Sequence, residues 1–288
     1  MKRRAVVAAM AVLLAMIAAA AVAGEWKTID NDRWCRESRW NGDQETYCEV
    51  REITIPAGRD VIRVDGGANG GIEVEGWDRD EIEIRVKVKA WDQDEDDARQ
   101  MVEDIDVEVD GRVIRAEGPR QRHRHGWSVS YRLMVPRQSN LDLQATNGGL
   151  AVTDVEGEIY LDTTNGGISI SNLAGDVKGT TTNGGLNVEL TGDRWEGDGL
   201  DVRSTNGGVS LEIPEDYNAE LETGTVNGGI EVDFPDHGAG PDWQEAARHA
   251  RRRRSQGARA YHQRRRSPVP QLRRPKKAET RCRRGRSY

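Results

Sequence analysis

Four acidic side chains in the middle of the chain have types and a spacing that could support acid–base chemistry. They are Asp154, Glu156, Glu158 and Asp162. Paired carboxylates can act as general acid and base on a glycosidic bond. One function that these residues would allow is that of a carbohydrate-active enzyme, a polysaccharide lyase or hydrolase built on a β-helix. We treat it as the alternative to a protein without enzymatic activity. Solvated charges on turns and outer strand faces explain the same residues, and the long loops of a sugar cleft are missing, so we expect no enzyme and no catalytic residue.

Motifs for other chemistries are absent from the sequence. It contains no Gly-x-Ser-x-Gly, His-Glu-x-x-His or phosphate-binding loop. His123 and His125 are the only histidines before residue 236 and have no cysteine near them, so we expect no metal. The glycine-rich stretch at 65–71 is not followed by a predicted helix, so it indicates a turn, and we expect no cofactor.

Two cysteines near the start of the chain predict a disulfide. Residues 1–23 have the basic start, apolar run and small residues of a secretory signal peptide. Export favours a bond between Cys35 and Cys48, which would stabilise the fold by about 3 kcal/mol on the chain-entropy model. No later apolar stretch is long enough to cross a bilayer. We expect an exported protein, periplasmic or extracellular, without a membrane anchor.

The strongest pattern in the sequence is a repeated Asn-Gly-Gly triplet. An early copy begins at Asn69, and later copies recur about 18 residues apart, with two longer intervals. The later copies are Asn147-Gly148-Gly149, Asn165-Gly166-Gly167, Asn183-Gly184-Gly185, Asn206-Gly207-Gly208 and Asn227-Gly228-Gly229. Asn-Gly predicts a turn with positive φ, and the second glycine would let neighbouring backbones approach closely. A second turn is predicted in mid-unit, near Gly157 and Gly175.

Apolar residues fall into columns at fixed offsets from each triplet. Three places after the Asn come Leu150, Ile168, Leu186, Val209 and Ile230. Five places after it come Val152, Ile170, Val188, Leu211 and Val232, and six places before it Leu141, Ile159, Val177, Leu200 and Leu221. Small residues stand two places before it. Alternation on both sides of the triplet predicts two strands per unit. One unit cannot bury its apolar face alone, so we expect an all-β, β-helix-like solenoid.

The repeated Asn has two interpretations. In the first, its amide hydrogen-bonds to its own backbone or to the same Asn one coil away. In the second, a row of Asn side chains binds a sugar or an ion. Identical spacing in every unit favours the first. The longer intervals, around 192–199 and 215–218, predict loops, which are better candidates for specific contacts.

The sequence divides into five segments. After the signal peptide we expect a disulfide-bearing segment at 24–60, an opening β module at 61–136, the solenoid at 137–235 and a basic disordered tail at 236–288. The opening module should contain strands at 61–64, 72–74, 82–88, 107–109, 113–116 and 127–135. It should also contain one short helix at 96–104, capped near Asp96 or Asp97.

Part of the sequence resembles a known protein family. The run Asn-Gly-Gly-Ile-Glu-Val-Glu-Gly-Trp-Asp at 69–78, the Thr-Asn-Gly-Gly repeats and the strand at 127–136 are similar to those of the DUF4097 family. The resemblance covers about 60–235. It implies a β-helix-like fold and an adhesin-like role in bacterial envelopes, without an agreed biochemical activity.

The column pattern stops after Phe234. Acids outnumber bases before this point, whereas Arg dominates after it. Read one nucleotide later, the codons of residues 258–267 permit Leu-Glu-Leu-Thr-Thr-Asn-Gly-Gly-Val. We therefore interpret residues 236–288, with Cys282, as a frameshift product, which the nucleotide sequence around Pro235 can test. The alternative is a disordered basic tail that binds nucleic acid, anionic lipid or the acidic body.

The sequence favours a non-enzymatic envelope protein. We expect an adhesin-like or interaction module, or a structural scaffold, whose partner is an unknown envelope protein or polysaccharide. No nucleic acid is expected to bind residues 24–235, and the oligomeric state is not indicated. Trp77 and Trp195 form the possible binding surface, since Trp often anchors interfaces.

Overall fold

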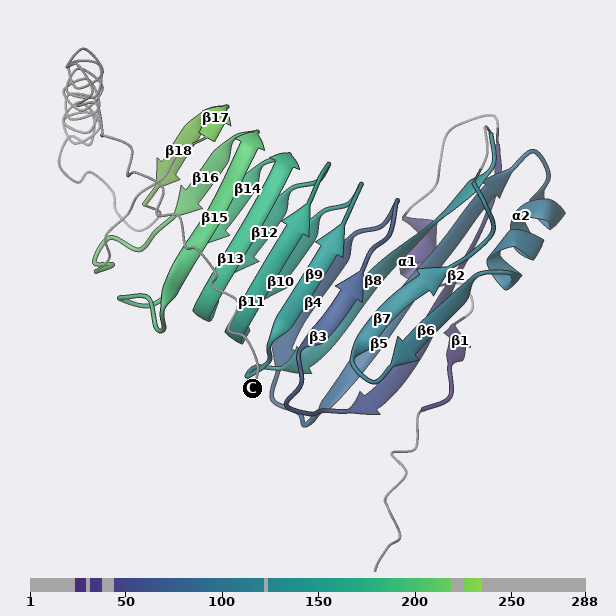
Figure 1. The fold of residues 1–288 in the computed structure, drawn as a ribbon, viewed down its shortest axis with the longest axis horizontal. Helices are drawn as coiled ribbons and strands as arrows, with labels where there is room; N and C mark the ends of the chain where they lie inside the picture. Colours follow the sequence, from purple (N-terminus) through teal and green to yellow (C-terminus); the bar gives the residue numbers. More distant parts are fainter. Residues whose placement is uncertain (1–23, 30–31, 38–43, 122–123, 219–224, 235–288) are drawn as a thin grey trace, which may run out of the picture. The chain divides into compact units, whose positions relative to one another are not determined.

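The computed structural model describes residues 24–29, 32–37, 44–121, 124–218 and 225–234. All of them belong to one compact unit of the chain. The predicted signal peptide at 1–23 and the predicted tail at 236–288 lie outside the described residues. Figure 1 shows the described strands side by side in two layers.

The described residues form eighteen strands and two helices. The strands are β1 (Lys27–Ile29), β2 (Glu45–Pro56), β3 (Ile62–Asp65), β4 (Ile72–Trp77), β5 (Glu81–Asp92), β6 (Asp106–Asp110), β7 (Val113–Glu117), β8 (Gly126–Pro136), β9 (Leu141–Ala145), β10 (Leu150–Thr153), β11 (Glu156–Thr163), β12 (Ile168–Ser171), β13 (Ala174–Asn183), β14 (Leu186–Glu189), β15 (Gly199–Asn206), β16 (Val209–Glu212), β17 (Thr225–Asn227) and β18 (Ile230–Asp233). The helices are α1 (Arg33–Arg36) and α2 (Glu95–Glu103).

The repeats form a β-solenoid in which every coil gives one strand to each of two sheets. In the ten-stranded sheet, β4, β10, β12, β14, β16 and β18 are neighbours in that order. In the eight-stranded sheet the order is β3, β9, β11, β13, β15 and β17. All of these neighbours pair in parallel. The expected all-β solenoid is confirmed.

Equivalent apolar residues of successive coils lie opposite each other. Ile168 pairs with Leu150 on one side and with Leu186 on the other. The column three places after the Asn is at most 4 % exposed from Leu150 to Val209. The two predicted columns after the Asn are therefore buried rows of one core as far as Val209 and Leu211. In the column before the Asn, Leu141, Ile159 and Val177 are buried and Leu200 is partly buried, while Leu221 lies outside the described residues. The last described coil differs, because Ile230 is 38 % exposed and Val232 is 37 % exposed.

The first coil is separated from the second by an insertion. β3 and β4 pair with β9 and β10, so the early triplet at Asn69 belongs to the stack. Between Trp77 and Leu141 lie β5, α2, β6, β7 and β8. β8 pairs in parallel with β4 and antiparallel with β5, which in turn pairs with β2. On the other sheet, β7 pairs with β3. The insertion thus extends both sheets beyond the first coil.

Helix α2 begins earlier than its sequence suggested. Its N-cap is Asp94, whose carboxylate accepts a hydrogen bond of 2.8 Å from the backbone N–H of Asp96. The predicted cap near Asp96 or Asp97 was wrong, because those acids already lie in the first turn, where they favour the positive end of the helix dipole. Ala98 and Val102 face the core.

The two glycines of each triplet differ in their surroundings. A Cβ on the first glycine of the third late triplet, Gly184, would lie 2.0 Å from the carbonyl oxygen of Gly166 in the neighbouring coil. A Cβ on Gly185 would lie 3.5 Å from the oxygen of Gly208, an ordinary contact. The expectation that the second glycine permits the close approach was wrong, since the first one does.

The expected positive φ at the triplets was also wrong. Among the described residues, the coils have positive φ at the mid-unit turns instead, for example at Asp154, Asn172, Gly157 and Gly175. The triplet corner is tight because two backbones nearly touch there. Its glycine requirement therefore arises between coils and not within one turn.

We expect an Ile→Ala substitution to lower the free energy of unfolding by different amounts at two positions of the column three places after the Asn. Ile168→Ala should lower the free energy of unfolding by about 2–5 kcal/mol, because it leaves a cavity in a closed layer. The matched Ile230→Ala should cost about 1 kcal/mol or less, because its side chain is partly exposed. Urea unfolding measures both. Equal losses would contradict the layered core.

A second pair of variants tests which glycine of a triplet is required by the close approach of two coils. Gly184→Ala should destabilise by about 3 kcal/mol, because the added methyl group collides with a carbonyl group that belongs to the neighbouring backbone. Gly185→Ala should change stability by no more than about 0.5 kcal/mol. Thermal unfolding of the two variants side by side is the measurement, and a larger loss for Gly185→Ala would reverse our assignment.

Candidate functional site

The Asn side chains of the triplets form a ladder along one edge of the stack. The side-chain N–H of Asn165 donates to the Oδ1 of Asn147 at 2.8 Å, and Asn183 donates to Asn165 at the same distance. Asn206 and Asn227 continue the ladder at 2.9 and 2.7 Å. The amides thus hydrogen-bond from coil to coil. This agrees with the first interpretation of these residues, in which each Asn amide bonds to the same Asn one coil away.

A row of buried hydroxyl groups lies beside this ladder. Thr163 and Thr181 are 1 % and 3 % exposed, and Ser204 is 5 % exposed. Each hydroxyl donates to the carbonyl oxygen of a first glycine in the preceding coil, as Thr181 does to Gly166 at 2.8 Å. These three residues, each two places before an Asn, therefore donate a hydrogen bond to a carbonyl group of the neighbouring coil.

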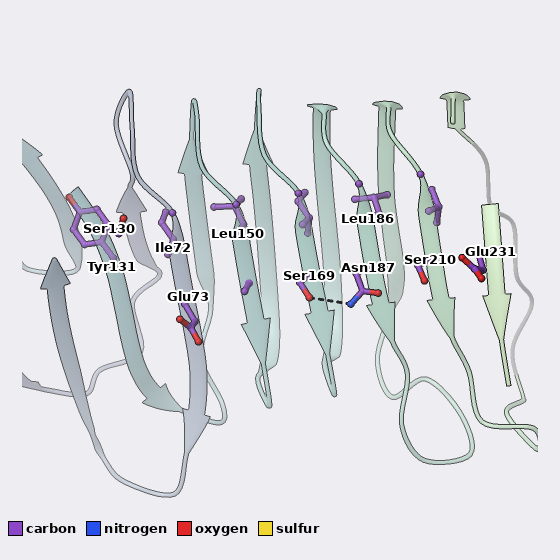
Figure 2. Close-up of a pocket in the computed structure, with 18 of the residues that line it drawn as sticks. Ile72, Glu73, Ser130, Tyr131, Leu150, Ser169, Leu186, Asn187, Ser210 and Glu231 are labelled. Atoms are coloured by element: carbon purple, nitrogen blue, oxygen red, sulfur yellow. Dashed lines mark hydrogen bonds between the residues drawn. The ribbon is translucent and has the colours of Figure 1, made fainter. Parts of the chain in front are cut away.

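A groove of about 1080 Å³ crosses the outer face of the ten-stranded sheet. Figure 2 shows some of its lining side chains on consecutive strands. Its lining includes the second glycine of each triplet: Gly71, Gly149, Gly167, Gly185, Gly208 and Gly229. The outward residues beside Gly149 to Gly208 are small, namely Ala151, Ser169, Asn187 and Ser210. Sequence reasoning missed this groove, although glycine followed by a small outward residue in successive units was a readable signal.

One end of the groove is lined by Trp34, which sequence reasoning also missed. The Nζ of Lys87 lies 4.8 Å from its ring centroid, and the guanidinium carbon of Arg132 lies 4.3 Å from it. Arg132 also forms an ion pair of 2.7 Å with Glu73. Burial, Lys89 and Arg132 lower the pKa of Lys87, while Glu37 acts in the opposite direction. Two cationic side chains therefore lie over the Trp34 ring at this end.

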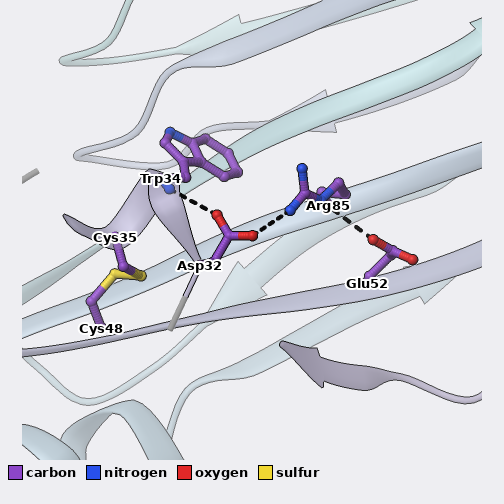
Figure 3. A network of polar contacts seen from close by, with 6 residues as sticks. All are labelled: Asp32, Trp34, Cys35, Cys48, Glu52 and Arg85. Carbon is purple, nitrogen blue, oxygen red and sulfur yellow. Dashed lines mark hydrogen bonds and ion pairs between the residues drawn. A yellow bond between two sulfur atoms is a disulfide. The ribbon is translucent and has the colours of Figure 1, made fainter. Parts of the chain in front are cut away.

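Trp34 is held in place by a disulfide and a capping carboxylate, both drawn in Figure 3. The Cys35–Cys48 disulfide, with a Cα–Cα distance of 5.8 Å, joins α1 to β2 and confirms the predicted bond. Asp32 accepts a hydrogen bond of 2.8 Å from the backbone N–H of Trp34. Its other oxygen accepts one of 2.6 Å from Arg85. A helix of four residues has little stability of its own, so these bonds fix its position.

Trp77 and Trp195 do not lie at this groove. The indole N–H of Trp77 donates to the carbonyl oxygen of Glu81 at 2.9 Å, and Arg79 lies over its ring at 4.5 Å. The indole of Trp195 donates to the carbonyl oxygen of Gly175 at 3.0 Å and packs against the core. Both rings cover chain turns, and a contact with a partner would use only their remaining faces.

The two predicted loops lie next to each other. The backbone N–H of Asn218 donates to the carbonyl oxygen of Asp193 at 2.7 Å, so the loop after β16 pairs with the loop after β14. Tyr217 packs against the core beside them. Burial, Asp193 and Glu196 raise the pKa of Tyr217. Together with Trp195, these residues form an aromatic and acidic loop edge.

The four acidic residues considered for catalysis have no common cleft. Asp154 lies in a mid-unit turn and accepts a hydrogen bond from Asn172. Glu158 and Asp162 point outward from β11, where Asp162 accepts from the hydroxyl of Thr180 at 3.1 Å. Within the described ranges, no group of three or more potential ligands could hold a metal ion. No helix there is long and apolar enough to cross a membrane.

Comparison with solved structures finds several bacterial proteins that are similar over about two thirds of the chain. A candidate adhesin from Parabacteroides distasonis covers 67 % of this chain and 98 % of its own, with 12 % identity and a TM-score of 0.27. A candidate lipid-binding protein from the same species covers 67 % of both chains, with 15 % identity and a TM-score of 0.24. A candidate adhesin from Parabacteroides merdae covers 67 % and 97 %, with 9 % identity and a TM-score of 0.27.

No curated protein matches the sequence. The family model described as Toastrack DUF4097 matches residues 52–257. This range contains every described coil of the solenoid and the whole insertion between Trp77 and Leu141. It also agrees with the resemblance of the Asn-Gly-Gly repeats. The chain therefore belongs to the Toastrack DUF4097 family.

Proposed function

We propose that the chain is an exported, non-catalytic scaffold of the bacterial envelope that binds another envelope component, as an adhesin-like or interaction module. One observation carries the proposal. Successive coils are in register, so outward side chains form straight rows in which neighbours lie about 4.8 Å apart. Such a rigid, repeating surface suits recognition of a long partner, as the binding surfaces of other solenoids do.

Export is supported by the covalent structure near the start of the chain. Cys35 and Cys48 are bonded, and disulfides persist mainly in oxidising compartments. The residues at 1–23 have a signal-peptide pattern in sequence. Together these features favour a periplasmic or extracellular location.

The loop edge is one contact surface for a protein or polysaccharide partner. Trp195 and Tyr217 are partly buried there and are flanked by Asp193 and Glu196. Aromatic groups that are fixed by packing lose little conformational freedom on binding, which makes them suitable anchors. The opposing proposal, a structural protein without a discrete ligand, assigns no role to this edge beyond folding.

Substitution of one aromatic anchor should separate these two proposals. Trp195→Ala should weaken capture of an envelope component by about 30-fold, the loss expected of an interface hot spot. The measurement is a titrated pull-down from envelope extract, with thermal unfolding to show that the variant is folded. Tyr160→Ala is the matched control, because Tyr160 on β11 is exposed on the outer face of the eight-stranded sheet and does not belong to the loop edge.

One result would contradict the interaction proposal, and another would contradict the choice of the loop edge as its surface. If neither the parent chain nor the control captures any component above background, the structural scaffold is the better account. If Trp195→Ala retains full capture, the loop edge is not the contact surface.

A further inference from the structure

The groove has features of a ligand site that the fold itself does not require. We propose that it binds an extended, largely uncharged glycan chain that carries one acidic group at its Trp34 end. This inference rests on the proposed function and names a ligand class and a site for it. The loop edge described above is a separate surface.

The openness of the groove is not a requirement of folding. The first glycines are necessary, because a Cβ there would lie about 2 Å from a backbone oxygen. The second glycines have neither positive φ nor such a clash. A Cβ on Gly208 would lie 3.6 Å from the oxygen of Gly229, and one on Gly229 would meet nothing within 4 Å. Side chains at these positions would project into the groove, so glycine keeps it open.

The lining offers the groups that bind sugars. Ser169, Asn187 and Ser210 place hydroxyl and amide groups on neighbouring strands, and exposed glycine backbone gives an apolar surface beside them. The only charged residues in the lining are Glu73 and Glu231. A nearly uncharged strip in a chain of net charge −7 is complementary to a neutral polar ligand.

The direction of the groove selects an extended chain. It runs across β8, β4, β10, β12, β14, β16 and β18, a distance of roughly 30 Å at about 4.8 Å between strands. This spacing is close to the length of one sugar residue in an extended β-linked glycan, so each coil can meet one residue. An extended peptide is less suitable, because peptides add to a free strand edge and this groove crosses a sheet face.

The acidic group belongs at the Trp34 end. Lys87 and Arg132 both lie over the Trp34 ring, and Lys89 is close enough to Lys87 to lower its pKa. Glu73 is paired with Arg132, and Lys87 is a further cation over the same ring. An anion here would gain from partly desolvated cations.

The rest of the surface disfavours a polyanion. The outward row next to the groove contains Glu189, Glu212 and Asp233 on β14, β16 and β18. With Glu231 in the lining, these carboxylates would repel a chain that is charged at every residue. A single acidic group near Lys87 avoids that repulsion.

The test uses two sugars that differ in one group. Cellohexaose and cellohexaose oxidised to a carboxylate at its reducing end are titrated into the full chain by calorimetry at low salt. We expect both to bind, with the acidic sugar about fivefold tighter because of one partly exposed ion pair. Lys87→Gln should remove that preference while the neutral sugar keeps its affinity.

A second experiment fills the groove with larger side chains. The double variant Gly185→Val and Gly208→Val should weaken binding of both sugars by at least about tenfold, while thermal unfolding stays that of the parent. Tyr160→Ala on the other sheet should bind like the parent.

The outcomes distinguish this inference from the proposed function. Absence of sugar binding, or unchanged affinity in the double valine variant, would overturn the groove site. The interaction proposal would still stand if envelope capture depends on Trp195. Equal affinity of the parent for the two sugars would overturn the acidic end.

Discussion

The structure depends on parallel, in-register contact between one coil and the next. A single unit has two short strands and one apolar face, which it cannot bury by itself. Each added coil covers the rows below it, so Leu150, Ile168, Leu186 and Val209 become one interior. The same contact sets the corner: the Asn amide, the buried hydroxyl and the first glycine all act between coils. Register is therefore specified several times in every layer.

This redundancy leaves the outer surfaces free to vary. The core rows and the corner fix the backbone, whereas the outward positions of the ten-stranded sheet are under no packing constraint. In those positions the chain has glycine and small polar residues near the triplets and acids further along the strands. A groove on such a rigid base is pre-organised, since no loop has to close for a ligand to enter.

Much of the fold could be predicted from the sequence, because the pattern of apolar residues has the period of the structure. Ile168 and its equivalents were placed in one row from their offsets alone, and Cys35 and Cys48 were paired from their context. The role of Gly184 could not be predicted, because the clash involves a residue 18 positions earlier and depends on how closely coils approach. Asp94 was missed as a helix cap because several acids follow it, and each is a plausible cap by type.

The candidate site was less predictable than the fold. Trp77 and Trp195 were selected by residue type, but their indole N–H groups bond to the backbone, so their packing roles appear only in three dimensions. Trp34 was missed because it lies in a helix of four residues, far in sequence from Lys87 and Arg132. The groove was missed because the second glycine of each triplet was interpreted as a close approach of two backbones and not as an open position on the outer face.

The register of adjacent coils is the central claim, and cysteine cross-linking tests it most directly. Ser169 on β12 lies opposite Asn187 on β14. Cysteines at 169 and 187 should therefore form a disulfide under mild oxidation, while cysteines at 169 and 189 should remain largely unlinked. The yield of each bond can be measured by mass spectrometry of the folded protein. Faster linking of the second pair than of the first would contradict the layered, in-register stack.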